Sequence, residues 1–171
     1  MLELLEDPAY RHVLANHLPV TGLVVAWVVL VVALAQRHRP TLFVALGLVA
    51  LMAGSALPVV AAGEDAYPFV YDKLDGTGRA WLDHHAHLAD RWALILYANA
   101  ALALAAIGVG AWRANLLRRL ALGVALVTAG GLGAACVISE AGGKIAHPEF
   151  RLSEPPVHDS SGRLGRQGGG R

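Results

Sequence analysis

The sequence has little charge and almost no cysteine, and both shortages narrow what the chain can be. Its 171 residues are 56% hydrophobic and only 16% charged, with a single cysteine. Four stretches, 18–36, 40–63, 92–112 and 120–139, contain no Asp, Glu, Lys or Arg. A soluble domain carries more charge and spreads it along the chain, so this distribution argues against a soluble globular protein. One cysteine, Cys136, also excludes an intramolecular disulfide.

Each of these charge-free stretches has about the 20 residues that a helix needs to cross a bilayer. In lipid, only helices and closed barrels satisfy their backbone hydrogen bonds. Continuous Leu, Val and Ala runs lack the alternation of barrel strands, so they favour helices. The sequence predicts an all-α integral membrane protein, a four-helix up-down bundle in the lipid bilayer formed by residues 1–151. The Gly-, Ser- and Pro-rich segment 152–171 is predicted to be a disordered polar tail.

Acidic residues are missing from the two short turns between these helices. Turns 36–39 and 112–119 carry five arginines and no acid, whereas all 13 acidic residues lie in the N-terminal segment, in 63–91 or after residue 139. Basic residues gather in cytoplasmic loops of membrane proteins. We therefore expect both turns to be cytoplasmic, and both termini and the 63–91 segment to be extracytoplasmic.

The segment 63–91 contains the helix breakers Pro68, Gly76 and Gly78, which predict a loop. Thr77 is expected to cap a helix that runs early into the third span.

Several function classes have no support in the sequence. We find no phosphate-binding glycine loop, no nucleophile arrangement that demands catalysis, and no basic patch for nucleic acid. The spans lack the ionisable side chains that a proton pathway requires, which argues against a proton-coupled transporter. The protein is therefore expected to be neither an enzyme nor a nucleic-acid binder.

Three histidines occur within "DHHAHLAD" (83–90), just before the third span. At 100° per residue, His85 falls on the apolar face of this helix together with Trp81. A buried imidazole needs a hydrogen bond or a ligand, so His85 is a candidate site residue. The opposite, polar face carries Asp83, His84 and His87.

Other candidate ligands lie at the ends of the remaining helices. In an up-down bundle, the start of the first helix and the end of the second meet the start of the third and the end of the fourth. Imidazoles and carboxylates gathered there suit a haem or a metal ion. The cofactor-binding set is predicted as His17, His85 and His147. For a metal, we add Glu64 and, more weakly, His12.

The motifs around these histidines carry a resemblance. "HVLANHLPVTG" (12–22) matches a His-x4-His-[Phe/Leu]-Pro opening, and "EAGGKIAHPEF" (140–150) matches a Gly-Gly-x-Ile-x-His-Pro-Glu ending. Over about residues 10–151, the chain resembles a bacterial family of predicted four-helix membrane proteins of unknown function, some of them suspected b-type cytochromes. The resemblance implies a multi-pass protein of the bacterial plasma membrane. Its histidines correspond to His12, His17, His85 and His147.

Three functions remain open at this point. The first is electron transfer through a haem b or metal ion held at the extracytoplasmic side. The second is a non-catalytic accessory subunit or assembly factor of a larger membrane complex, with structural histidines. The third is a periplasm-facing copper or zinc binding protein.

Overall fold

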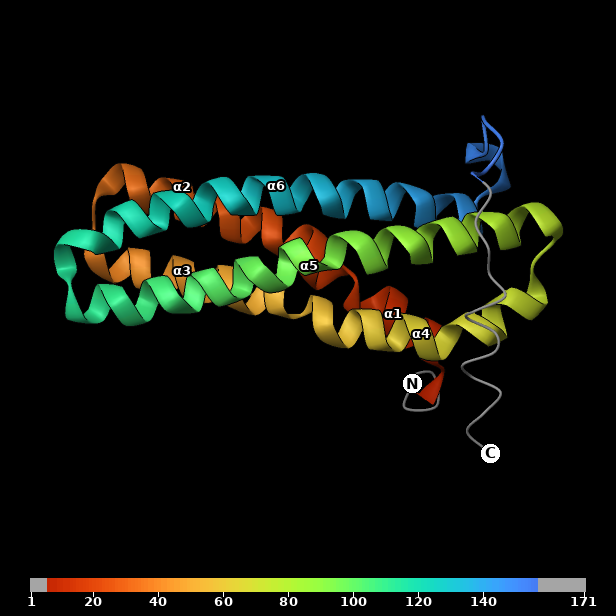
Figure 1. Cartoon of the computed structure of the whole chain (residues 1–171), viewed down its shortest axis with the longest axis horizontal. Helices are drawn as coiled ribbons and strands as arrows, with labels where there is room; N and C mark the ends of the chain where they lie inside the picture. Colours follow the sequence, from red (N-terminus) through yellow and green to blue (C-terminus); the bar gives the residue numbers. More distant parts are fainter. Residues whose placement is uncertain (1–5, 157–171) are drawn as a thin grey trace.

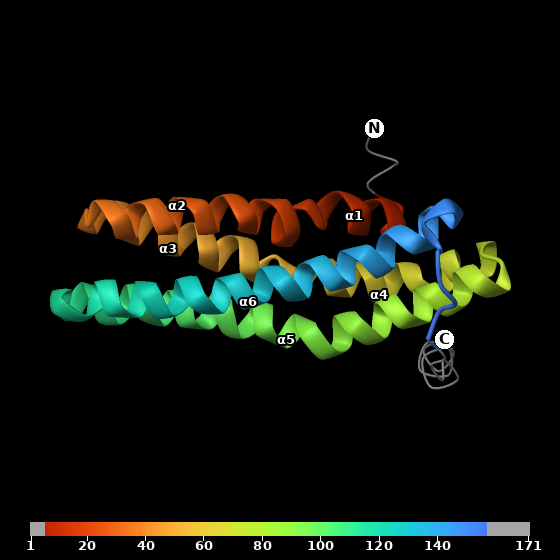
Figure 2. The same ribbon diagram turned by 90° about the horizontal axis from the view of Figure 1, so that it is seen from above.

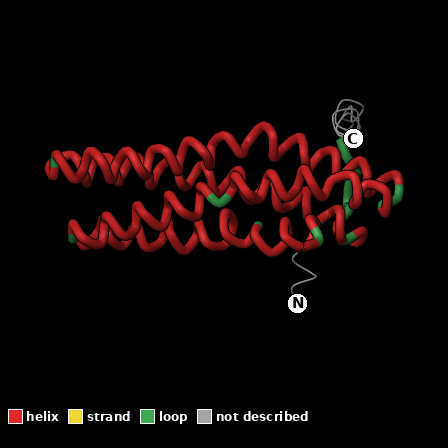
Figure 3. The backbone as a smooth tube through the Cα atoms, turned by 90° about the horizontal axis from the view of Figure 1, so that it is seen from below, coloured by secondary structure: helices red, strands yellow, loops and turns green. Residues whose placement is uncertain are grey.

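A computed structural model describes residues 6–156 as four long helical rods laid side by side (Figure 1). Each rod is long and apolar enough to cross a membrane, as the charge-free stretches predict. Figure 3 shows helix throughout the described part, with short connections and no strand. The first rod consists of α1 (Pro8–Ala15), the π-helical turn η2 (Leu18–Gly22) and α2 (Leu23–Gln36). The others are α3 (Arg39–Gly54) with α4 (Ala56–Lys73), α5 (Gly76–Trp112), and α6 (Ala114–Ala146), which leads into a short 3-10 turn (Pro148–Phe150).

The rods follow one another around the bundle in an up-down order. α2 packs on α3, α3 on α5, α5 on α6, and α6 back on α2, while α1 packs on α4. In Figures 1 and 2, the short α2–α3 and α5–α6 connections lie at one end, and the start of α1, the α4–α5 connection and the end of α6 lie toward the other. We call these the arginine end and the histidine end.

Small residues let the rods approach closely. Alanine supplies much of the fully buried interior, as is usual where helices associate in lipid without a hydrophobic drive between them. One hydrogen bond also joins the first and fourth rods, because Trp27 Nε1 donates to the Ala125 carbonyl at 2.9 Å. Larger side chains fill the interior between the alanines: Leu23, Leu30, Leu46, Val49 and Leu117.

One polar pair is buried among these apolar contacts. The Thr128 hydroxyl lies 2.7 Å from the Val124 carbonyl oxygen and 3.2 Å from Asn99 Oδ1. Asn99 and Thr128 are both fully buried. Their pairing joins α5 to α6 below the histidine end.

The loop expected within 63–91 is almost entirely helical, whereas the helix expected to run early into the third span is confirmed. α4 continues through Pro68 to Lys73, and α5 begins at Gly76. Proline removes only one donor from the helix, the one that would pair with the carbonyl four residues earlier, and burial of the neighbouring Tyr67 holds this part of α4 in place. The N-cap of α5 is Asp75 rather than Thr77, since the Asp75 carboxylate accepts the Gly78 N–H at 2.5 Å.

The chain after α6 folds back on the helix end. Arg151 donates to the carbonyls of Lys144 at 2.7 Å and Ile145 at 3.0 Å, and its guanidinium lies 3.3 Å from the Asp75 carboxylate. It thereby satisfies carbonyls that the last turn of a helix leaves open and ties α6 to the start of α5. Of the predicted tail, residues 152–156 are non-helical, and 157–171 lie outside the described residues.

Candidate cofactor site

His85 lies on the inner side of α5, as the helical pattern predicts. Its Nδ1 is 2.9 Å from the Ile138 carbonyl oxygen of α6. Because a carbonyl can only accept, Nδ1 carries the proton, and in the neutral ring Nε2 keeps its lone pair. Trp81 is buried on the same face and His87 is exposed, in agreement with the predicted sorting.

Asp83 departs from that sorting. It is only 8% exposed, and the Tyr67 hydroxyl of α4 donates to its carboxylate. The helical pattern placed Asp83 on a solvated face because it ignored α4, which reaches this level as a helix and covers the residue. His84 is half-buried, with its ring edge-on to Trp81 at 5.7 Å.

His12 occupies the matching position on the other side of the bundle. It lies on α1, and its Nδ1 is 2.9 Å from the Val59 carbonyl oxygen of α4. The hydrogen bond therefore fixes the tautomer of His12 in the same way as that of His85. A backbone carbonyl on the second ring nitrogen is the usual support for a histidine that binds a metal through the first.

The two imidazoles are close neighbours in a T-shaped arrangement. Their ring centres are 6.1 Å apart and their planes are nearly perpendicular, at 86°. Two imidazoles on opposite sides of one metal would have ring centres about 6.4 Å apart, with bonds of about 2.0–2.1 Å and about 1.2 Å from each nitrogen to its ring centre. The separation of His12 and His85 is thus close to that of two imidazoles that would hold one metal ion.

A glycine on the neighbouring helix makes room for each ring. A Cβ on Gly63 would lie 2.9 Å from His12 Cε1 and Nδ1, and a Cβ on Gly142 would lie 3.2 Å from the same atoms of His85. Each glycine follows the accepting carbonyl by four residues, Val59 to Gly63 and Ile138 to Gly142. Any larger residue would crowd the imidazole away from that carbonyl.

The paired histidines line a cavity of about 880 Å³ between α1, α4, α5 and α6. This volume lies within the range of about 300–1,000 Å³ that small-molecule and cofactor sites occupy. Alanine and valine are the commonest residues in its walls, which also carry a few polar groups. The polar and titratable lining residues besides the pair are Asn16, His17, Glu64, Tyr67, Asp90 and Ser139.

The other predicted ligands are placed differently. His17 borders the cavity but is exposed, and its Nδ1 lies 3.1 Å from the Val13 carbonyl of its own helix rather than from a carbonyl of a neighbouring helix. His147 is exposed after α6, where it pairs with Glu149 at 3.0 Å and stacks on Phe150. The pKa of the Glu149 carboxyl is lowered, first by its own backbone N–H and then by this hydrogen bond.

Within residues 6–156, no three His, Cys, Asp or Glu side chains gather into a metal-binding group. The structure therefore joins His85 to His12, rather than to His17 and His147. Glu64 lines the same cavity without completing such a group.

The glycines and the two carbonyls were missed by sequence reasoning. The fourth charge-free stretch ends at residue 139, yet α6 continues through Gly142 and Gly143 to Ala146. In the sequence, Gly63 marks only the end of the second predicted span. The sequence did contain a signal for these glycines. Each lies near a carboxylate at the level of the histidines, and glycine in a helix interior costs stability and usually has a packing reason.

The fold and the cavity define an all-helical bundle with paired histidines between two helix pairs. No family model matches the chain, and neither curated proteins nor solved structures give a significant match. The resemblance to the four-helix bacterial family thus stays a prediction.

Proposed function

We propose that the chain is a multi-pass protein of the bacterial plasma membrane that binds one haem b between His12 and His85 and transfers electrons. Both termini and the histidine end face outward, and the arginine end faces the cytoplasm. The orientation is supported by turns 36–39 and 112–119, which carry arginine and no acidic residue. The cofactor is supported above all by one observation, the two imidazoles 6.1 Å apart, each anchored through Nδ1 to a backbone carbonyl.

The number of ligands favours haem over a structural zinc ion. Haem iron with two axial protein ligands leaves its other four positions to the macrocycle, whereas zinc needs about four ligands from its surroundings. His12 and His85 lie in ring contact, and within residues 6–156 no three His, Cys, Asp or Glu side chains form a group that could hold a metal ion. The alanine-rich cavity adds the space that a macrocycle would require.

The chain's own residues would set the properties of this site. The carbonyls of Val59 and Ile138 hold both imidazoles in one tautomer and increase their basicity. The apolar part of the cavity wall would lower the dielectric constant around a bound group. Bound haem would supply reversible one-electron chemistry, with a potential governed by the axial ligands and their hydrogen bonds.

An absorption spectrum of the protein purified from membranes tests the proposal. We expect a Soret band in the wild type and in His17→Ala, and none in His12→Ala or His85→Ala. His84→Ala is a further control, since that ring lies edge-on to Trp81. A band that survives in His12→Ala but disappears in His17→Ala would support the sequence-based ligand pair instead.

A second candidate function is copper binding on the extracytoplasmic side of the same membrane. It is favoured by the charge of the cavity, which is lined by Glu64 and Asp90 and, among its described lining residues, by no lysine or arginine. Carboxylates favour a cation, and the same two imidazoles suit copper. Stoichiometric copper without a Soret band would support this candidate. A colourless, metal-free protein that co-purifies with a larger complex would favour the accessory-subunit function.

A further inference from the structure

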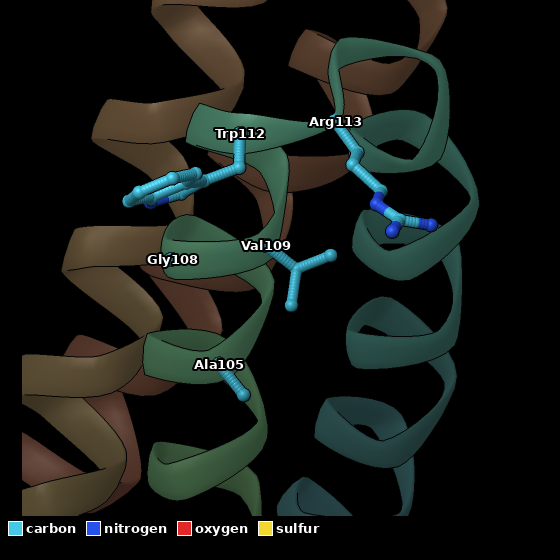
Figure 4. A pocket seen from close by; sticks show the side chains of 5 residues that line it. All are labelled: Ala105, Gly108, Val109, Trp112 and Arg113. Atoms are coloured by element: carbon cyan, nitrogen blue, oxygen red, sulfur yellow. The ribbon is translucent and has the colours of Figure 1, made fainter.

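A second hollow lies at the arginine end, far from the histidines. It has a volume of about 430 Å³ on the last two turns of α5 and is lined by Ala105, Gly108, Val109, Trp112 and Arg113. Figure 4 shows the Arg113 side chain running alongside the first turns of α6, while the Trp112 indole projects from the other side of α5. We call this hollow the Arg113 groove.

The floor of the Arg113 groove is apolar and unfilled. A Cβ on Gly108 would meet no atom within 4 Å, so no neighbouring side chain packs there. Trp112 is 92% exposed, and an exposed tryptophan at the end of a membrane-length helix belongs at the headgroup level. The groove therefore descends from the headgroup level along the apolar surface of α5.

The edge of the Arg113 groove at the end of α5 carries a positive charge that can bind an anion. Arg113 is exposed, and among residues 6–156 it has no ion-pair partner. Arg39 differs, since its Nη2 donates to the Gly110 carbonyl at 3.1 Å and its guanidinium lies 5.5 Å from the Phe43 ring centre. α6 also begins directly after Arg113 with no side-chain cap, so its first backbone N–H groups add to the positive potential.

We infer that the Arg113 groove binds an anionic phospholipid, with one acyl chain over Gly108 and the phosphate at Arg113. An arginine fork matches phosphate geometry, and the neighbouring arginines raise the local concentration of anionic headgroups. Since no acidic residue lies in either turn, nothing there opposes the negative charge. This site needs the chain to be embedded in a membrane but is independent of any cofactor.

The proposal predicts lipid selectivity that two side chains control. The protein is reconstituted into vesicles that contain equal amounts of phosphatidylglycerol and phosphatidylcholine. It is then extracted, and the lipid that it retains is measured by native mass spectrometry. We expect phosphatidylglycerol to be retained preferentially. Arg113→Gln should reduce that preference about fivefold, the effect of one basic residue near an anionic surface. Gly108→Leu should reduce retention of both lipids by filling the groove.

Matched variants separate a site from a general charge effect. Arg119→Gln removes another exposed charge, from the start of α6, and Gly123→Leu adds a side chain at another open helical glycine. Both should retain phosphatidylglycerol as the wild type does. Equal losses in Arg119→Gln and Arg113→Gln, or no preference for phosphatidylglycerol in the wild type, would overturn the proposal. Displacement of the lipid by millimolar inorganic phosphate would also overturn it, because the acyl chain would then contribute nothing.

Discussion

Adjacent glycines near the end of α6 allow a test of the histidine site that needs no knowledge of its ligand. A Cβ on Gly142 would lie 3.2 Å from the His85 ring, whereas one on Gly143 would meet no atom within 4 Å. Both substitutions to alanine should gain up to about 1 kcal/mol of helix stability. Only Gly142→Ala should also displace His85 from the Ile138 carbonyl, at a cost of about 1 kcal/mol for the hydrogen bond. We therefore expect Gly143→Ala to stabilise the protein and Gly142→Ala to leave its stability nearly unchanged.

Gly63→Ala should be the most damaging of the three. At 2.9 Å from His12 Cε1 and Nδ1, its Cβ could not be accommodated unless the ring moved. His12 would then lose its hydrogen bond to the Val59 carbonyl of α4, and that carbonyl would lose a donor. Together these losses should lower the free energy of unfolding by about 1–3 kcal/mol. Unfolding of the three variants by denaturant in detergent, monitored by circular dichroism, measures the order of their stabilities. Stabilisation by Gly142→Ala equal to that by Gly143→Ala would refute the claim that Gly142 makes room for His85.

Three further predictions concern the rest of the fold. Tyr67→Phe should lower the free energy of unfolding by about 1–3 kcal/mol, because it leaves the buried Asp83 carboxylate without its phenol donor; a change below about 0.5 kcal/mol, the usual size at a surface site, would contradict this. Arg151→Gln should increase amide hydrogen exchange in the last turn of α6, whose carbonyls the guanidinium caps, and unchanged exchange there would show that the contact is dispensable. In a Cys136→Ser background, Gly76→Cys should react with an impermeant thiol reagent added outside intact cells and Ala114→Cys should not; the reverse pattern would invert the proposed orientation.

The four rods could be predicted because the absence of charge is a local property. A stretch without Asp, Glu, Lys or Arg needs no knowledge of its neighbours to be recognised as membrane-length helix, and each predicted span lies within one rod. Helix ends were less predictable. Pro68 and the Gly142–Gly143 pair are breakers by local propensity, yet both lie inside helices that neighbouring elements hold in place.

The site was predictable only where one helix determines it. The position of His85 follows from the periodicity of α5 alone, and the structure turns its half-buried ring toward the Ile138 carbonyl of α6. The choice between His12 and His17 depends on which of them faces α4, and Val59 is 47 residues from His12 in sequence. Burial of Asp83 likewise requires α4, because its partner Tyr67 comes from that helix. Contacts between helices are not encoded in the period of either one.

The two halves of the site repeat one arrangement in two helix pairs, α1 with α4 and α5 with α6. In each pair a histidine donates to a carbonyl of the neighbouring helix, and a glycine four residues further on makes the approach possible. A ligand joined to both His12 and His85 would therefore connect the two pairs across the cavity. Such a ligand binds only when both pairs are in place, so it must stabilise the folded histidine end. The arginine end is closed by buried side chains such as Ala33, Leu42 and Leu117. Loss of the ligand should consequently loosen the histidine end first, while the packing at the arginine end persists.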